Sequence, residues 1–354
     1  MTDNLDDLKA NKETIRTSDV TASGSHFLKD FAVCPAKGAR QHFYSHPNIL
    51  DDPQYTVGLT GVYTPVQLLV GSAIHDGIEQ WYRSRIRDGE DTGEADLDSA
   101  IAAVEMGWAN RSRELHPDED TTTLVSATRV MIQRYHDHFG QKGPLQEWPA
   151  TKVVCDDTGE PWIEKHFEID LGGGFTYTAR IDLVVNHNGF LATMDHKSSK
   201  ASFVRQLLTQ AELEAQFTGQ LLCLREHAPQ LAITGILLNV LVKDRAKGPP
   251  FDRALLPRSR TNLDLYKLHT RDLFERISGW HEHYKTLLAS GMDSDKAFNI
   301  AWPMDGLRHG GCYQYYRKCT FWDLCRSPDI AGQLIASSMR PKKRVINEVT
   351  QEEV

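Results

Sequence analysis

The chain has 354 residues, of which 40% are hydrophobic and 25% are charged, and its formal net charge is −8. This composition is that of an ordinary folded globular protein, and the length allows one elaborated domain or two. The apolar runs fall well short of the ~20 residues of a membrane span and the polar start is no signal peptide, which predicts a cytoplasmic protein with no membrane partner. In a reducing compartment the six cysteines are expected to be thiols or metal ligands and not disulfides.

The charge is distributed unevenly along the chain. Residues 88–120 carry 11 acidic and 2 basic side chains, a net of −9, whereas residues 197–346 carry 23 basic and 14 acidic side chains, a net of +9. The overall acidity alone would argue against binding of nucleic acid. The cationic second half makes DNA binding compatible with the sequence without demonstrating it.

Residues 1–24 are polar and lack periodicity, which predicts a disordered tail. Ser25 can cap a short helix that ends at Cys34-Pro35. We expect a single domain from 25 to 338 and a polar tail from 339 to 354. The basic start of that tail is either a solvated terminus or an extension that contacts DNA.

Thr64-Pro65 predicts the start of a long helix that extends to about Arg87, with threonine at the cap and proline in the first turn. The small residues Gly71-Ser72-Ala73 within it permit close approach of another element, towards which His75 would project. A lone helical histidine is by itself more often a hydrogen-bonded core residue than a metal ligand. A helical insertion at about 90–148 follows, and we assign no chemistry to it.

Strands are predicted from Thr151 onward, because runs of β-formers are bounded there by turn residues. Gly172-Gly173-Gly174 is a turn between two of these strands and not a phosphate loop, because a strand follows it instead of a helix. Glu164 lies in the first of the two strands. The favoured interpretation of Glu164 is a solvent-facing strand residue, and metal ligation is the alternative.

Two apolar runs, Ile181–Val185 and Phe190–Met194, flank a polar link that contains Asn-Gly, which predicts a β-hairpin. Asp182 lies in the first strand and Asp195 ends the second. Lys197 follows two residues later, so alternation points it to the same face as Asp195. Three charged groups on one face are costly unless something compensates them, and a divalent metal between the aspartates would do so. The alternative is a surface hairpin with an Asp–Lys ion pair.

An amphipathic helix is predicted at Thr209–His227, and it carries Gln216 and Gln220 beside its apolar stripe. After it come an apolar strand, a basic loop, a second strand and a helix, at Ile233–Val242, at 243–260, near 263–269 and up to about Ala289. This order of elements predicts an α/β fold with a mixed sheet and helices on both of its faces.

Three cysteines lie close together in the sequence beyond the last long helix, in a segment rich in aromatic and basic residues: Cys312, Cys319 and Cys325. Zinc is the default metal for clustered cysteines of this kind, but C-x2-C pairs are absent. A [4Fe–4S] cluster needs four thiolates and accepts one distant ligand, which Cys34 can supply. Such a cluster would tie the two ends of the chain together, and we favour this structural role over a redox role.

Asp182 is followed after a dozen residues by Asp195-x-Lys197, a pattern that resembles the core of the PD-(D/E)XK nuclease superfamily. The local sequence around these residues is most similar to the RecB-type branch. The sequence GSAIH, which ends at His75, resembles the histidine helix of that branch, where the histidine binds metal. Gln216 matches the branch's glutamine, whereas Gln220 stands where a tyrosine is usual. One cysteine before the core and three after it resembles the iron–sulfur members of the branch, such as AddB and the CRISPR-adaptation exonucleases.

The resemblance implies a restriction-endonuclease-like fold with a C-terminal cysteine-rich cap. It implies a metal-dependent deoxyribonuclease that hydrolyses DNA phosphodiester bonds, an exonuclease in recombination, repair or phage DNA metabolism. The ligands of Mg²⁺ or Mn²⁺ would be three side chains and one main-chain carbonyl, those of His75, Asp182, Asp195 and His196. Lys197 would orient water or stabilise the transition state, and Gln216 would position water or phosphate. A [4Fe–4S] cluster would be held by Cys34, Cys312, Cys319 and Cys325.

Two other interpretations stay open. A non-cleaving DNA-binding module on the same scaffold, inside a larger assembly, could lose Asp182, Asp195 and Lys197 freely, so their presence argues against it. An iron–sulfur redox sensor would place its cluster near solvent. No G-x4-G-K-[ST] motif occurs, so ATP-driven unwinding would come from a helicase or recombination partner protein. The expected substrate is single-stranded DNA or duplex ends.

Overall fold

The computed structural model describes residues 22–43, 55–61, 64–212, 214–229, 233–243, 251–306, 312–314, 317–326 and 339–343. Most of the two predicted tails, 1–21 and 344–354, lies outside these residues. Contacts within the chain define two compact units where we expected a single domain. The first unit takes its residues from 1–62, 170–177 and 268–354, and the second takes its residues from 63–169 and 178–267.

The second unit is built on a mixed sheet flanked by helices, which confirms the predicted α/β fold. Strands β7, β8, β9 and β10 are consecutive neighbours, and β5 and β6 also pair with β7. The pairs β7–β8 and β9–β10 are antiparallel, whereas β8 and β9 are parallel, so a helical crossover joins them. The strands are β5 (Thr151–Val153), β6 (Ile163–Gly172), β7 (Phe175–His187), β8 (Phe190–Ser199), β9 (Ile233–Val242) and β10 (Phe251–Pro257).

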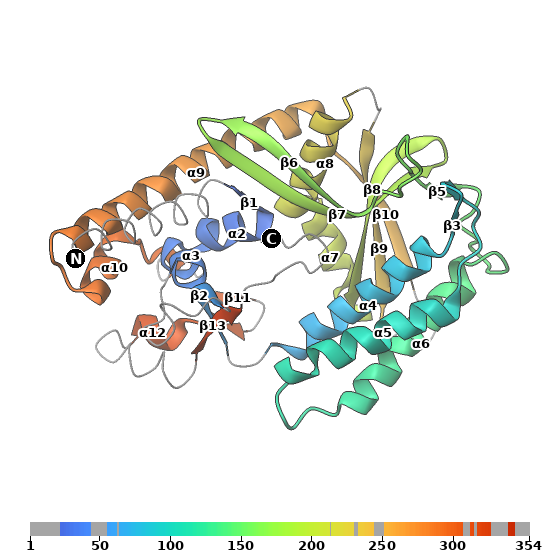
Figure 1. Cartoon of the computed structure of the whole chain (residues 1–354), viewed down its shortest axis with the longest axis horizontal. Coiled ribbons are helices and arrows are strands. Elements are labelled where there is room, and N and C mark those ends of the chain that lie inside the picture. The colour runs from blue at the N-terminus through green and yellow to red at the C-terminus, as the bar shows by residue number, and fades with distance from the viewer. Residues whose placement is uncertain are drawn as a thin grey trace, which may run out of the picture. The chain divides into compact units, whose positions relative to one another are not determined.

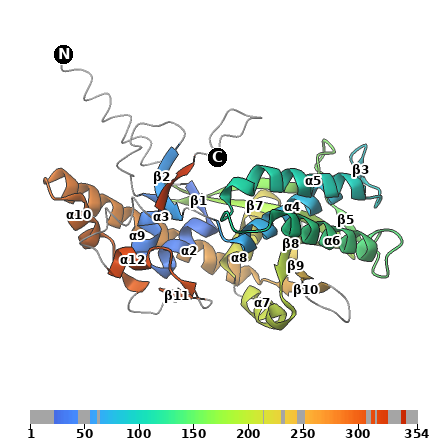
Figure 2. The same ribbon diagram turned by 90° about the horizontal axis from the view of Figure 1, so that it is seen from below.

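Three helices pack on one another against this sheet, namely α4 (Val66–Arg83), α5 (Leu97–Arg111) and α6 (Thr121–Phe139). They share a continuous hydrophobic core with sheet residues such as Leu183, Met194 and Leu237, and Figure 1 shows them stacked beside the strands. The crossover between β8 and β9 contains η3 (Ala201–Phe203), α7 (Val204–Ala211) and α8 (Ala215–His227). Figure 2 shows α7 on the side of the sheet away from α4 and α5. Two short strands and one turn of 3-10 helix complete this unit, β3 (Ile86–Arg87), β4 (Glu90–Asp91) and η2 (Ser112–Glu114).

The helix predicted at Thr209–His227 is wrong in its extent, because the chain breaks between α7 and α8. Arg258 donates to the carbonyl of Ala211 at 2.8 Å and to Thr218 Oγ1 at 3.1 Å. The Ala211 carbonyl also accepts from the Glu214 N–H at 3.3 Å, so a turn follows α7 directly. Arg258, which is distant in the sequence, adds two hydrogen bonds across this break.

The two predictions for the segment after β9 are also wrong. The basic loop expected at 243–260 contains strand β10, which pairs with β9 over all of its seven residues. The strand expected near 263–269 is the beginning of helix α9 (Arg260–Ala289). Ser259 and Asn262 each accept a hydrogen bond from the other's backbone N–H, an arrangement that caps a helix at its first turn.

The first unit has an aromatic core. The rings that pack together are those of Phe27, Phe31, Phe43 and Trp302. The ring centroids of Phe31 and Phe43 each lie within 5.7 Å of the Trp302 ring centroid. Strand β1 pairs with β7, and β2 pairs antiparallel with β13, so the chain segment predicted as a polar tail begins with a strand. Besides the last part of α9, its elements are β1 (Ala22–Gly24), α2 (Ser25–Val33), α3 (Pro35–His42), β2 (Tyr55–Gly61), α10 (Ser294–Ala301), β11 (Tyr313–Gln314), β12 (Arg317–Lys318), α12 (Trp322–Arg326) and β13 (Met339–Lys343). Across the described residues, helices that combine the length and the apolar character needed to cross a membrane are absent.

Candidate active site

The hairpin predicted around the two aspartates is present. Strands β7 and β8 pair from His187–Phe190 to Leu183–Met194, and the turn between them is Asn188-Gly189, with φ of 52° and 86°. Asn-Gly suits this turn because both residue types tolerate a positive φ. The pairing ends just before Asp182 and Asp195, while β8 continues beside β9. The two aspartates therefore lie where β7 and β8 part.

His75 reaches this position from helix α4. Its Nδ1 lies 3.1 Å from Asp182 Oδ2, and its Nε2 donates to the His196 carbonyl at 2.7 Å. Burial by itself would lower the pKa of His75, but the carboxylates of Asp182 and Asp195 raise this pKa to about 9. The imidazole is therefore protonated at neutral pH, and it forms an ion pair with Asp182 through the Nδ1 side of the ring. Asp182 and the His196 carbonyl are two of the groups predicted as metal ligands.

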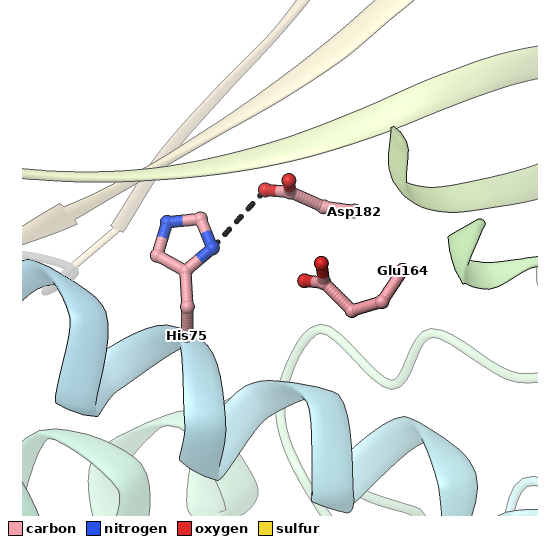
Figure 3. Close-up of side chains that lie close together, drawn as sticks. All are labelled: His75, Glu164 and Asp182. Carbon is pink, nitrogen blue, oxygen red and sulfur yellow. Dashed lines mark ion pairs between the residues drawn. The ribbon is translucent and has the colours of Figure 1, made fainter. Parts of the chain in front are cut away.

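Glu164 is a member of this group that the sequence analysis assigned to solvent. Ligand atoms of His75, Glu164 and Asp182 lie within 4.8 Å of one another, and Figure 3 shows the three side chains converging. Residues 166, 168 and 170 of β6 are exposed, so alternation points Glu164 outward as well. Glu164 instead has a left-handed φ of 53°, and its side chain is only 12% exposed. This conformation costs roughly 1–3 kcal/mol in a non-glycine residue, so surrounding contacts must enforce it.

Lys197 and Gln216 lie on either side of the second aspartate. Lys197 Nζ is 2.6 Å from Asp195 Oδ1, and Gln216 Nε2 donates to Asp195 Oδ2 at 3.4 Å. Gln216 is in the first turn of α8, so the break after α7 determines its position. The Lys197 ammonium also lies 5.5 Å from the centre of the Phe217 ring. The strand alternation used in the sequence analysis is therefore correct for Asp195 and Lys197.

The pKa values of the carboxyl groups in the site are shifted in different directions. Burial raises the pKa of Asp195 to about 6 against the opposing charge of Lys197, and the charge of Asp182 adds to the rise. Burial also disfavours the Asp182 carboxylate, but the hydrogen bond and the charge of His75 lower the pKa of Asp182 to about 2. Burial and then the charge of Asp182 raise the pKa of Glu164 to about 7, although Arg180 lies 2.5 Å away. The charge of Asp182 therefore opposes ionisation of both Asp195 and Glu164, and a divalent cation among the carboxylates would relieve that repulsion.

The donor atoms fit a cation of the Mg²⁺ or Mn²⁺ type. Asp182 Oδ2 and Asp195 Oδ1 are buried and accept no well-formed hydrogen bond, although His75 and Lys197 lie close to them. Oxygen and imidazole ligands suit Mg²⁺ or Mn²⁺, and no thiolate is near. The side chains of His75, Glu164 and Asp182 would hold the cation, with Asp195 and the His196 carbonyl next to them.

The second glutamine of helix α8 has a different environment from the first. Gln220 Nε2 donates to the Arg180 carbonyl at 3.1 Å, and the residue is buried. Gln220 therefore supports the backbone of β7 two residues before Asp182 and does not contact Asp195.

The four cysteines singled out in the sequence all belong to the first unit. A Cβ atom added at Gly306 would lie 3.3 Å from Cys34 Sγ and 3.1 Å from Cys312 Sγ, so these two sulfurs flank one point. The Cys319 N–H donates to the Cys312 carbonyl at 2.8 Å. Burial raises the pKa of Cys325, and the charges of Cys319, Cys34 and Cys312 add to this rise. All four are free thiols that lie near one another.

The mixed sheet flanked by helices places the protein in the restriction-endonuclease-like fold class. The family model of the PD-(D/E)XK nuclease superfamily matches residues 28–326, and the chain belongs to this superfamily. Its members are nucleases that use divalent metal ions, which agrees with the donor atoms gathered around Asp182. No match was found among curated proteins.

The affinity for Mn²⁺ is expected to increase with pH. His75 must lose a proton to bind a cation, and with a pKa of about 9 it keeps that proton throughout the neutral range. Affinity should therefore rise about tenfold per pH unit from pH 7 to 9. The rise should be steeper below pH 7, because Glu164 with a pKa of about 7 and Asp195 with a pKa of about 6 are also protonated there. Calorimetric titration with Mn²⁺ from pH 6 to 9 measures this, and a constant affinity between pH 7 and 9 would contradict His75 as a ligand.

Proposed function

We propose that this protein is a Mg²⁺- or Mn²⁺-dependent deoxyribonuclease of the RecB-type branch, an exonuclease that acts on single-stranded DNA or duplex ends in recombination, repair or phage DNA metabolism. One observation carries this proposal. Ligand atoms of His75, Glu164 and Asp182 converge within 4.8 Å, beside a lysine that is held by a second buried aspartate. Burial raises the pKa of Glu164 and of Asp195, so these carboxylates are poorly stabilised by the neighbouring side chains alone, which supports a bound cation.

The residues of the site would have separate roles in phosphodiester hydrolysis. A divalent cation, when bound by His75, Glu164, Asp182 and the neighbouring groups, supplies the Lewis acidity that activates water and neutralises charge on the phosphate. Lys197 places a positive charge beside the reacting phosphate, where it orients the water or stabilises the negative charge of the transition state. Gln216 offers an amide on the other side of Asp195 that can hold water or a phosphate oxygen.

Two lysines at the ends of the strands β8 and β9 support a polyanionic substrate. Lys200 directly follows β8 and Lys243 directly follows β9, and the last paired residues of these strands, Ser199 and Val242, are neighbours. The Lys243 ammonium donates to Gln67 Oε1 on α4 at 2.9 Å. Burial and then the charge of Lys200 lower the pKa of Lys243. A DNA phosphate beside the two lysines would replace this repulsion by attraction.

The proposal extends to a [4Fe–4S] cluster held by Cys34, Cys312, Cys319 and Cys325 in the first unit. Within the described residues, no three of these sulfurs lie within 4.8 Å of one another. The sulfurs of a tetrahedral zinc site would be about 3.8 Å apart, because each lies ~2.3 Å from the metal. The choice of a [4Fe–4S] cluster over zinc depends on the resemblance of the cysteine pattern to the iron–sulfur members of the branch, and the iron and zinc content of the purified protein tests it.

End-labelled single-stranded DNA, linear duplex DNA and closed circular DNA test the proposed activity. We expect Mn²⁺ or Mg²⁺ to permit degradation of the linear substrates from their ends, and EDTA to stop it, because the carboxylates need the cation. Circular DNA should persist if the enzyme is an exonuclease. DNA binding without cleavage of any substrate, at any concentration of Mn²⁺, would contradict the proposal and favour a non-cleaving module.

A further inference from the structure

A buried polar network lies behind the active site, on the side of β8 that faces α4 and α6. Asp195 and Lys197 point to one side of the strand, so the side chain of His196 between them points to the other. His196 is 3% exposed, and its ring centroid lies 5.8 Å from the rings of Tyr82 on α4 and of Tyr135 on α6. Its main-chain carbonyl accepts the hydrogen bond from His75 in the site. His196 therefore joins the protein interior to the proposed metal ligands.

A chain of hydrogen bonds leads from His196 to a buried carboxylate. Asn239 Nδ2 lies 3.2 Å from His196 Nδ1 and donates to the Tyr135 hydroxyl at 3.1 Å. The hydroxyls of Tyr135 and Tyr82 are 2.8 Å apart, and Tyr82 donates to the two oxygens of Glu147 at 3.0 and 2.9 Å. An amide nitrogen only donates and a carboxylate only accepts, so the Asn239 amide also donates to His196 Nδ1. Tyr135 can donate to the Tyr82 hydroxyl or, at 3.4 Å, directly to Glu147 Oε1, so the Glu147 carboxylate accepts the last hydrogen bond of the network in either case.

Two arginines bind Glu147, the carboxylate at the other end of this series of hydrogen bonds. Arg85 Nη1 donates to Glu147 Oε2 at 2.9 Å, and Arg253 Nη2 donates to Glu147 Oε1 at 2.5 Å. Arg253, Asn239 and His196 are also neighbours across the adjacent strands β10, β9 and β8. Breaking a buried ion pair on one side typically costs about 3–5 kcal/mol, so this anchor resists displacement. The network can therefore act as a rigid support.

We propose that Asn239 and Tyr135 are positioning residues of the active site. By holding the His196 side chain in one orientation, they set the direction of its carbonyl and the placement of Asp195 and Lys197 on either side of it. This inference rests on the proposed metal-dependent nuclease function. It also gives a role to the helical insertion, which supplies Tyr135 and to which the sequence analysis assigned no chemistry.

The variants Asn239→Leu and Tyr135→Phe test this, because each removes hydrogen-bonding atoms at nearly constant volume. Removing a hydrogen-bonded support of a metal ligand typically weakens metal binding or activity about 10–100-fold. We expect the affinity for Mn²⁺, titrated by electron paramagnetic resonance, to fall about tenfold in Asn239→Leu. In Tyr135→Phe it should fall roughly threefold, because Tyr135 is one hydrogen bond further from His196 than Asn239 is. Cleavage should recover in large part at saturating Mn²⁺.

Thr128→Val is the matched control. It removes a buried hydroxyl on the same helix α6, one that accepts from Trp108 Nε1 at 3.2 Å and makes no contact with His196. This variant should lower the melting temperature and leave the Mn²⁺ affinity unchanged. An equal loss of Mn²⁺ affinity in Thr128→Val would overturn the inference, because the effect would then follow stability and not position.

The remaining outcomes separate the inference from the function on which it rests. Mn²⁺ binding by the wild-type protein with unchanged affinity in Tyr135→Phe would overturn the inference alone. If Asn239→Leu does not fold, Tyr135→Phe decides, since it removes only one oxygen atom. Wild-type protein that binds no Mn²⁺ would overturn the proposed nuclease function and this inference together.

Discussion

Asp195→Asn is expected to reduce the rate of DNA cleavage by about 10³-fold or more, which corresponds to ~4 kcal/mol in the activation barrier. The substitution removes a negative charge at nearly constant volume, at a residue that is completely buried. Because burial and Asp182 already disfavour this carboxylate, its neutral replacement should keep the fold or stabilise it. Initial rates at saturating Mn²⁺ and thermal melting measure the two effects separately.

Asp264→Asn is the matched control for this prediction, since its side chain is 58% exposed in the same unit and pairs only with Arg225 among the contacts described. It should cleave DNA at the wild-type rate. Lys197→Met should be as inactive as Asp195→Asn but should still bind Mn²⁺, because an ammonium group is not a metal ligand and methionine keeps the contact with Phe217. Wild-type turnover in Asp195→Asn would remove the assigned active site.

Protein purified without oxygen should be brown and contain about four irons per chain. Cys319→Ser should lose this iron and melt at a temperature lower by about 5 °C or more, because free energy of cluster binding contributes to folding. Loss of cleavage in that variant would then follow from unfolding. Iron analysis, the visible spectrum and thermal melting measure these properties.

Cys155→Ser is the control for the cluster, because Cys155 is a half-buried thiol that belongs to the second unit, whereas the four cysteines belong to the first. It should retain its iron. One equivalent of zinc with no iron would show that the cysteines bind a different metal. Full iron content in Cys319→Ser would remove Cys319 from the ligand set and require another fourth ligand.

Much of the nuclease core could be predicted because its signals are local. The hairpin follows from β-formers on both sides of an Asn-Gly turn, and the common face of Asp195 and Lys197 follows from the two-residue period of a strand. His75 was predicted as a ligand because GSAIH resembles the histidine helix of the superfamily branch, and the structure brings it to 3.1 Å from Asp182. Each of these features involves residues that are close in the sequence.

The errors occurred where distant contacts override local preference. The prediction of a strand near 263–269 is wrong, because the reciprocal cap of Ser259 and Asn262 starts helix α9 before it. The prediction of a loop over 251–257 is also wrong, because the edge of β9 supplies the hydrogen bonds of strand β10. Arg258, from outside the helix, adds a hydrogen bond at the break before Gln216.

The amino-acid sequence by itself determined that Asp182, Asp195 and Lys197 meet on a hairpin, because turn chemistry and strand alternation act within a few residues. Only the tertiary structure decided that Glu164 joins His75 and Asp182, since its left-handed backbone reverses the direction that alternation predicts. Only the tertiary structure decided that a chain of buried side chains from Glu147 to Asn239 lies behind His196, since its members come from separate helices and strands. Such contacts form when the elements pack together, and no short-range pattern in the chain encodes them.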